Sequence, residues 1–328
     1  MTERLSTRVT DLLGIRYPIL QAGMSWASSN AELPAAVSAA GGLGVIAAGP
    51  MYPDDLRAAI GRVRAMTTAP FAVNVPLYNK RADAFLQIVL DEKVPILIAS
   101  QGGPGKHIAR FKDAGVTWLH VAASPVHALK AEAAGVDAVI AVGAEAGGHP
   151  PPDEVGTLVV VRAVAAALRI PVIGGGGVAD GAGIAALLSL GAEGVQLGTR
   201  FLLTPEARLH PAYKERALAA AIADTTLVGR GRMPVRVLRN AFTQAVADAE
   251  ANGMATAEIA ALIDTGTLKM AAHDGDVAHG KVEVGQSVGL IDEILPAAEV
   301  MRRLVAETEA AIARLTRMSS AAAMAEPA

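Results

Sequence analysis

A histidine stands between glycines and prolines in the stretch VGAEAGGHPPPDEV, residues 142–155. His149 follows the pair Gly147–Gly148 and precedes the prolines at 150–152. An imidazole titrates near pH 6.5, so it can take or give a proton under neutral conditions. The glycines leave room for a flat ring to approach, and the prolines reduce the freedom of the loop. The stretch therefore predicts His149 as an acid or base, with a structural loop histidine as the alternative.

A second stretch has the glycines of an anion site. In PVIGGGGVADGAGIAALLSLGAEGVQLGTRF, residues 171–201, one apolar run ends in Gly174–Gly177 and another ends in Gly198 and Thr199. Uncovered backbone N–H groups next to a helix start favour a phosphate, and the Thr199 hydroxyl adds a donor. In barrels such a site commonly follows the seventh and eighth strands. The alternative is that these glycines only turn the chain.

Two further polar clusters support weaker predictions. The histidines and aspartates of AAHDGDVAHG have no standard zinc spacing, so we predict no metal site there; they are His273, Asp274, Asp276 and His279. The arginines of GRGRMPVRVLRN either form a solvated face with ion pairs between domains or bind an anionic group of NAD(P)H or an acyl carrier; they are Arg230, Arg232, Arg236 and Arg239.

Eight apolar or β-branched runs must position these residues. They start near positions 17, 42, 70, 94, 116, 136, 170 and 192, at intervals of roughly 20–35 residues, which is about one strand and one helix each. The runs are continuous rather than alternating, which is typical of strands covered on both faces. Glycines follow most of them. We therefore predict an α/β fold, a (β/α)8 TIM barrel with its site at the carboxyl ends of the strands.

The pattern changes after residue 203. Residues 204–284 have the periodicity of helices and no clear strand, which predicts a mainly helical inserted second domain over the barrel mouth, in contact with the substrate. An amphipathic helix within 285–318 is expected to return to the barrel formed by residues 1–203. The small residues at 319–328 predict a disordered tail.

Composition excludes several classes of function. The 328 residues are 52% apolar and 19% charged, with a formal net charge of −3, which indicates neither a nucleic-acid nor a membrane partner. The chain has no cysteine, so a thiol nucleophile, a disulfide and a thiolate metal site are excluded. Its apolar runs are too short for a signal peptide or a membrane span, and we expect a cytoplasmic protein.

Five motifs together resemble a known family. They are QAGMSWASSNAELPAAVSAAGGLGVIAAG, FAVNV, GAEAGGH, the glycine-rich stretch ending in VQLGTRF, and GQSVGLIDEI. Their order and spacing resemble the nitronate monooxygenase (2-nitropropane dioxygenase) family over about residues 10–312. This is a family of FMN-dependent TIM barrels that also includes NAD(P)H:quinone reductases and flavin-dependent enoyl-acyl-carrier-protein reductases.

The resemblance implies an FMN site and a catalytic residue. It places the phosphate on Gly176, Gly177, Gly198 and Thr199, and the flavin ring against the backbone of residues 22–24. Asn74 would bond the polar edge of the flavin, with Gln101 as a weaker candidate. The full implied cofactor set is Ala22, Gly23, Met24, Asn74, Gln101, Gly147, Gly148, Gly176, Gly177, Gln196, Gly198 and Thr199. His149 matches the family's catalytic histidine, whereas His120 either faces the flavin or packs at a strand end.

The resemblance also implies an activity. The first expectation is oxidation of alkyl nitronates with O2 to carbonyl compounds and nitrite, in which His149 deprotonates a neutral nitroalkane. The alternative is NAD(P)H-dependent reduction of a quinone or an enoyl thioester with the same FMN. A non-redox lyase or isomerase that binds a sugar phosphate is a remote alternative. The sequence leaves open the physiological substrate, the use of NAD(P)H and the formation of a homodimer.

Overall fold

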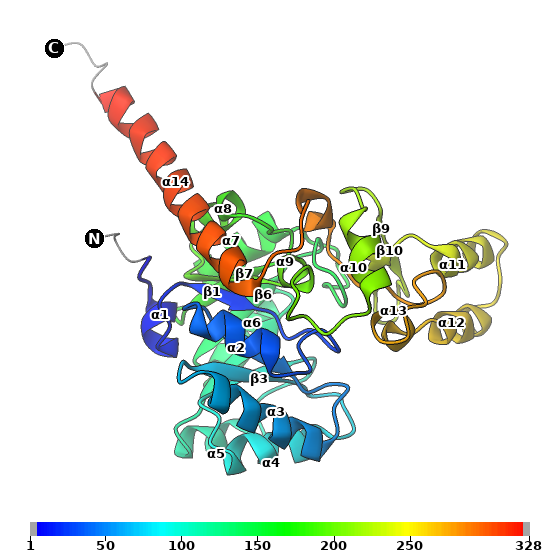
Figure 1. The fold of residues 1–328 in the computed structure, drawn as a ribbon, viewed down its shortest axis with the longest axis horizontal. Helices are drawn as coiled ribbons and strands as arrows, with labels where there is room; N and C mark the ends of the chain where they lie inside the picture. The colour runs from blue at the N-terminus through cyan, green and yellow to red at the C-terminus, as the bar shows by residue number, and fades with distance from the viewer. Residues whose placement is uncertain (1–4, 324–328) are drawn as a thin grey trace.

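Eight parallel strands form the centre of the computed structural model, which describes residues 5–323. They are β1 (Ile19–Gln21), β2 (Gly44–Ala47), β3 (Phe71–Pro76), β4 (Ile96–Ser100), β5 (Thr117–Ala122), β6 (Ala138–Val142), β7 (Val172–Gly175) and β8 (Gly194–Leu197). They are hydrogen-bonded in the order β1-β8-β7-β6-β5-β4-β3-β2. The Leu43 N–H donates to Ile19 O at 2.9 Å and the Gln21 N–H donates to Leu43 O at 3.0 Å, which joins the two ends of the sheet. The chain thus forms the predicted (β/α)8 barrel (Figure 1).

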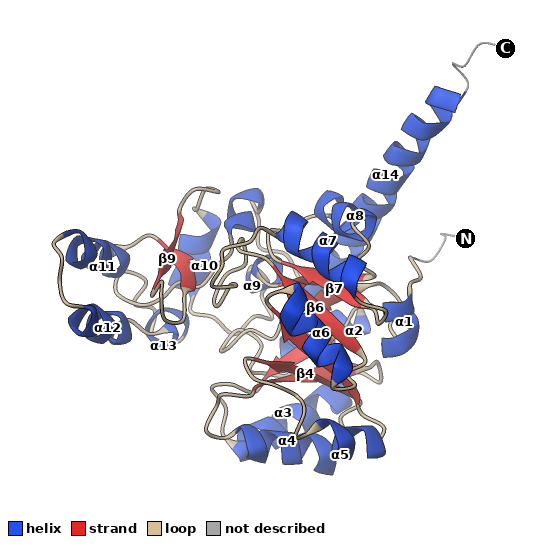
Figure 2. Cartoon of the chain, turned by 180° about the vertical axis from the view of Figure 1, so that it is seen from behind, coloured by secondary structure: helices blue, strands red, loops and turns tan. Residues whose placement is uncertain are grey.

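One helix precedes the first strand, and the others connect the strands and cover the barrel (Figure 2). They are α1 (Arg8–Leu13), α2 (Glu32–Ala39), α3 (Pro53–Met66), α4 (Ala82–Asp91), α5 (Ile108–Asp113), α6 (Pro125–Ala133), α7 (Thr157–Ala167) and α8 (Gly181–Ser189). Val9 and Leu13 of α1 belong to the same buried cluster as Ile98 inside the barrel. A Cβ built on Gly194, where β8 starts, would lie 3.0 Å from Val9 Cγ1. Helix α1 therefore closes the end of the barrel at which the strands begin.

The barrel strands are buried on both faces. On β2, Val45 belongs to the cluster inside the barrel, whereas its neighbour Ile46 belongs to the cluster between strands and helices. Successive strand residues point to opposite faces, so both faces need apolar side chains. This explains why the apolar runs of the sequence are continuous.

The segment after β8 differs from its prediction. It contains α9 (Thr199–Leu202), α10 (Pro211–Leu218), β9 (Thr225–Val228), β10 (Val235–Leu238), α11 (Ala241–Ala251), α12 (Thr256–Thr265), α13 (Leu268–Ala272) and the 3-10 helix η1 (Gln286–Leu290). We expected no strand here, but β9 and β10 form an antiparallel pair. Each strand has only four residues, too few to show a period. They are stabilised by a small core of their own, with Val237, Phe242 and Ile263.

The last helix, α14 (Ala297–Ala323), packs against α8 and α2 and then extends away from the barrel (Figure 1). It continues through residues 319–323 of the tail for which the sequence predicts disorder. Residues 324–328 of the tail lie outside the described residues. Within residues 5–323, no helix has the length and apolar character that crossing a membrane requires.

The contact between α2 and β2 leaves no space for a side chain on Gly44. A Cβ built there would lie 1.8 Å from the Pro34 carbonyl oxygen. Gly61, in the middle of α3, has no heavy atom within 4 Å of its built Cβ. The two glycines therefore form a matched pair, one required by packing and one not.

We expect Gly44→Ala to lower the free energy of unfolding by about 3 kcal/mol or more, because the methyl group forces α2 off the barrel. Gly61→Ala should instead raise it by about 0.5–1 kcal/mol, because alanine loses less entropy in a helix. Urea unfolding followed by circular dichroism measures both. Equal stability of the two variants would contradict the close contact between α2 and β2.

Candidate active site

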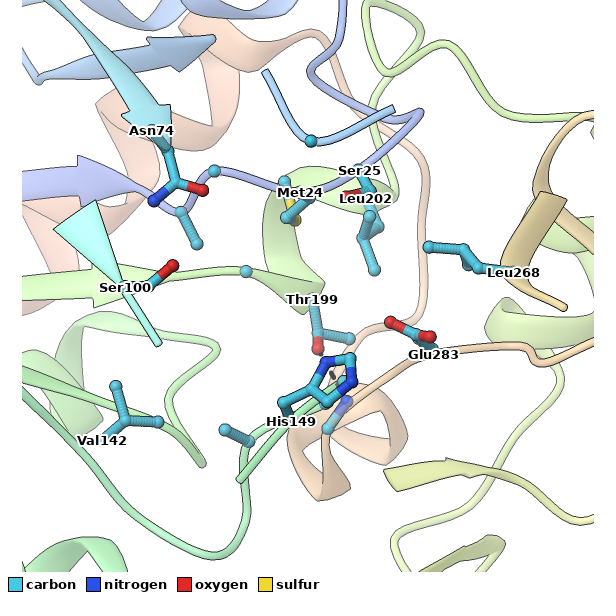
Figure 3. A pocket seen from close by; sticks show the side chains of 18 of the residues that line it. Met24, Ser25, Asn74, Ser100, Val142, His149, Thr199, Leu202, Leu268 and Glu283 are labelled. Atoms are coloured by element: carbon cyan, nitrogen blue, oxygen red, sulfur yellow. Dashed lines mark hydrogen bonds between the residues drawn. The ribbon is translucent and has the colours of Figure 1, made fainter. Parts of the chain in front are cut away.

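A cavity of about 590 Å³ opens where the barrel strands end (Figure 3). Residues 204–296, which we call the post-barrel segment, form its outer wall. Tyr213, Leu268 and Glu283 belong to this wall. Every residue that the sequence predicts for the site lines this one cavity: Ala22, Gly23, Met24, Asn74, Gln101, Gly147, Gly148, His149, Gly176, Gly177, Gln196, Gly198 and Thr199. The fold thus brings together residues from both ends of the barrel sequence.

The glycines after β7 and β8 form a cradle for an anion. Gly176 and Gly177 have φ angles of 101° and 71°, which favour glycine. Among the described residues, the N–H groups of Gly176, Gly177, Gly198 and Thr199 donate no backbone hydrogen bond. The Thr199 Oγ1 accepts from the Gly285 N–H at 2.9 Å, so its own hydrogen remains available as a donor. Several donors therefore face the cavity, and this set suits a phosphate.

The loop after β1 offers fewer free polar groups than residues 22–24 suggest. The Ala22 N–H donates to Leu197 O at 2.9 Å, and the Met24 N–H donates to Ser28 Oγ at 3.0 Å. Asn74 Nδ2 donates to Ile98 O at 3.1 Å, which leaves Oδ1 for a ligand. A Cβ on Gly23 would lie 2.5 Å from Asn74 Cβ. Gly23 is thus needed for packing against Asn74. Its N–H has no partner among the described residues and is free for a ligand.

The loop that carries His149 is held by the post-barrel segment. The Arg236 N–H of β10 donates to Gly148 O at 2.7 Å, and the Gly148 N–H donates back to Arg236 O at 3.2 Å. A Cβ on Gly147 would lie 2.5 Å from the carbonyl carbon of Val284. This changes the reason for the glycine pair, which we assigned to the approach of a flat ring. The pair permits close contact with two distant backbone segments.

Two charged side chains fix the base of the same loop. The Glu145 carboxylate accepts from the Thr157 N–H at 2.8 Å and from Thr157 Oγ1 at 2.7 Å, where the N-cap Gly156 of α7 has no side chain to do so. The buried Arg236 side chain donates from Nε to Ala144 O at 2.9 Å. Both ends of the His149 loop are therefore anchored.

The His149 ring projects into the cavity together with the Thr199 hydroxyl and the Glu283 carboxylate (Figure 3). The His149 side chain is exposed to the cavity. The protein atoms around the ring nevertheless displace part of its hydration shell. This desolvation, and then the positive charge of Lys281, lower the pKa of His149 below 6.5. The imidazole is therefore neutral at pH 7 and has a lone pair to accept a proton.

Glu283 is a site residue that sequence reasoning missed. Burial raises the pKa of its carboxyl group to about 7, although Lys281 opposes the shift. A Cβ on Gly148 would lie 3.2 Å from Glu283 Oε2, so the carboxyl group faces the His149 loop. Its backbone carbonyl accepts from the buried Tyr213 hydroxyl at 2.8 Å. The only sequence signal was its position just before the motif GQSVGLIDEI.

Other predicted polar residues lie elsewhere. His120 lines a second cavity and not the first, and burial lowers the pKa of its ring to about 4. Arg230 forms an ion pair with Glu154 at 2.6 Å, which agrees with the interpretation of its cluster as partly ion-paired. His273 and His279 pair with neighbouring aspartates, Asp274 at 2.8 Å and Asp276 at 3.1 Å.

Comparison with known proteins gives consistent similarities. The family model described as nitronate monooxygenase matches residues 6–85 and 78–307. The chain is 36% identical to a nitronate monooxygenase of Paraburkholderia phytofirmans, over 98% of this chain and 100% of the relative. It is 33% identical, over 98% of this chain and 100% of the relative, to a Mycobacterium tuberculosis protein. That protein is named (3aS,4S,5R,7aS)-5-hydroxy-7a-methyl-1-oxo-octahydro-1H-indene-4-carboxyl-CoA dehydrogenase.

A solved structure is also similar over nearly the whole chain. The structure of FabK from Thermotoga maritima superimposes with a TM-score of 0.90 at 43% identity, covering 95% of this chain and 99% of that one. The post-barrel segment is thus included in the similarity.

The raised pKa of Glu283 makes stability depend on pH. A carboxyl group whose folded-state pKa is raised contributes stability below its unfolded-state pKa and loses it as the pH rises through the folded-state value. Glu283→Gln cannot ionise, so its stability relative to the unsubstituted protein should increase from pH 5 to pH 8. Urea unfolding of both proteins at the two pH values measures this change. If the difference in unfolding free energy between the two proteins is the same at both pH values, the carboxyl group of Glu283 ionises as in water.

Proposed function

Because the chain belongs to the nitronate monooxygenase family of flavin oxidoreductases, we propose that it binds FMN and oxidises alkyl nitronates with O2 to carbonyl compounds and nitrite. One observation carries this proposal: a neutral histidine, His149, lies in the same cavity as a glycine cradle for a phosphate. The cradle accounts for cofactor binding, and the histidine accounts for proton removal.

The residues present fit FMN. The phosphate would be held by the N–H groups of Gly176, Gly177, Gly198 and Thr199, which are free among the described residues. The Asn74 Oδ1 would accept a hydrogen bond from the polar edge of the ring. When bound, the flavin supplies the electron acceptor for the oxidation.

His149 and Glu283 have complementary roles in this proposal. The neutral imidazole takes the α-proton of a nitroalkane, and the anion so formed needs a donor near its nitro oxygens. Glu283 holds a proton below about pH 7 and can donate it in a hydrogen bond to one of those oxygens. Above that pH its negative charge disfavours an anionic substrate.

A second candidate function is the NAD(P)H-dependent reduction of a thioester or quinone with the same cofactor. The observation that favours it is the full-length similarity to the Mycobacterium tuberculosis dehydrogenase, whose name specifies a CoA ester. Anaerobic oxidation of NADH or NADPH with a quinone or an enoyl thioester, together with no turnover of nitronates, would favour the reductase over the oxygenase.

We expect Gly198→Asp to abolish flavin retention, whereas Gly198→Ala should keep it. A Cβ at this position would meet no atom closer than 3.6 Å, and its φ of −102° suits any residue. Only the aspartate adds a negative charge against the phosphate. Loss of charge-assisted hydrogen bonds at roughly 1.5–3 kcal/mol each should weaken binding by at least about tenfold per bond.

The absorbance of each purified variant near 450 nm, relative to 280 nm, measures the bound flavin. If Gly198→Asp retains as much flavin as Gly198→Ala, the phosphate lies elsewhere.

We expect His149→Asn to lower turnover of a neutral nitroalkane by roughly 10²–10⁴, the range for loss of a general base. Oxidation of the preformed nitronate should fall less, because no proton has to be removed. Since the pKa of His149 is lowered, kcat/KM of the unsubstituted enzyme for the nitroalkane should fall as the pH drops below 6.5, and it should fall again above about pH 7, where Glu283 loses its proton. Steady-state assays with both substrates from pH 5 to 9 measure these effects.

Bound flavin and circular dichroism control for folding of His149→Asn. An equal loss with both substrates would assign His149 to positioning, and no loss with either would remove it from the reaction.

A further inference from the structure

A second cavity of about 530 Å³ adjoins the first. The two cavities share Gln101, Val121, Val142 and His149 as wall residues. Its volume lies within the range of small-molecule sites. A ligand with one end beside His149 can therefore extend past this residue into the second cavity.

The walls of the second cavity are apolar. Pro104, Ala122, Ala131, Met233 and Pro234 contribute to it, together with the three prolines that follow His149. The proline and alanine side chains have no hydrogen-bonding group, and the Met233 Sδ already accepts from Gln101 Nε2 at 3.8 Å. They therefore favour a hydrocarbon part of a ligand. The proline run is thus part of a binding surface as well as a stiff loop.

The charged residues of the second cavity are all basic. Lys130 and Arg232 line it, together with His127, and no described residue of its wall is an aspartate or glutamate. Lys130 and Arg232 make no ion pair or side-chain hydrogen bond within residues 5–323. Arg230 of the same cluster, in contrast, is paired with Glu154. The cavity therefore has two uncompensated cations that suit an anionic group.

One nitrogen of a buried ring in the wall lacks a hydrogen-bond partner within residues 5–323. His120 is 6% exposed, and its Nδ1 has no hydrogen-bond partner in the part of the chain described. Buried polar atoms are rarely left unpaired, because this costs free energy. Because this nitrogen is itself buried, the ring contributes to the wall by packing and not by a hydrogen bond to a ligand.

We propose that the second cavity binds the hydrocarbon chain and terminal anionic group, a carboxylate or phosphate, of an amphipathic ligand whose other end reaches His149. The chain lies against the proline and alanine wall, and the anion pairs with Lys130 and Arg232. The reaction of the other end beside His149 rests on the proposed function. Binding of the hydrocarbon chain in the second cavity does not depend on that function. The enzyme would therefore select long, anionic molecules over short nitroalkanes.

Isothermal titration calorimetry of the flavin-loaded protein with octanoate, decanoate and dodecanoate tests the apolar part. Each added methylene should tighten Kd about fourfold, as expected for about 0.8 kcal/mol per buried methylene. Dodecanol and dodecyltrimethylammonium, the neutral and cationic analogues, should bind at least tenfold more weakly than dodecanoate. A Kd that does not change with chain length, or equal affinity for all three head groups, would overturn the proposal.

Charge-removing variants test the anionic part. Arg232→Met and Lys130→Met keep the aliphatic stems, and each should weaken dodecanoate about tenfold but leave dodecanol unchanged. Arg62→Met is the matched control, because Arg62 is exposed on α3 and lines neither cavity. Unchanged dodecanoate binding in both cavity variants would overturn the assignment of these cations.

Three further probes distinguish the sources of the anion. Dodecyl phosphate tests a phosphate head group, and dodecanoyl-CoA tests a thioester carrier. Binding of either one supports the site if shorter chains bind more weakly and if Arg232→Met and Lys130→Met weaken binding. Binding of NADPH, weakened by Arg232→Met, without binding of any amphiphile would overturn the proposal in favour of a nucleotide site. Because calorimetry requires no turnover, failure of nitronate oxidation would not affect these results.

Discussion

Closure of the parallel sheet is the constraint on which the site depends. Hydrogen bonds through Leu43 join the two ends of the sheet, and β1 pairs with β8 on its other side. The loop after β1 therefore lies next to the end of β8, where the Ala22 N–H donates to Leu197 O. A Cβ on Gly198 would lie 3.6 Å from Met24 Sδ. Without the pairing of β1 with β8, the glycine cradle and the β1 loop would lie at opposite edges of the sheet, with no common cavity between them.

The post-barrel segment supplies what the barrel lacks. Its strand β10 forms main-chain hydrogen bonds with Gly148, and the backbone of Val284 lies against Gly147. These contacts hold the histidine loop while its ring stays open to the cavity. The same segment brings Glu283 into a place with little water, and this raises the pKa of its carboxyl group. One set of backbone contacts thus positions an imidazole with a lowered pKa and a carboxyl group with a raised pKa in the same cavity.

The two cavities differ in charge although they share a wall. The first contains the Glu283 carboxyl group, Lys269, which pairs with Asp274, and the free N–H groups of the glycine cradle. The second contains Lys130 and Arg232 with no described carboxylate. His149 lies on both, and desolvation keeps it neutral at pH 7. A neutral residue at the junction adds no electrostatic barrier to a ligand that spans the two cavities.

The sequence alone determined the barrel, the glycine cradle and the place of His149. These follow from local patterns, because continuous apolar runs mark strands covered on both faces and glycines mark where the chain leaves them. Only the tertiary structure decided the place and the raised pKa of Glu283, the reason for Gly147 and the place of His120. Each of these depends on contacts between segments far apart in the chain, and burial by such contacts sets both the space around a residue and its pKa. The strands β9 and β10 also belong to this second group, since four residues are too few to show a period and packing around Phe242 stabilises them.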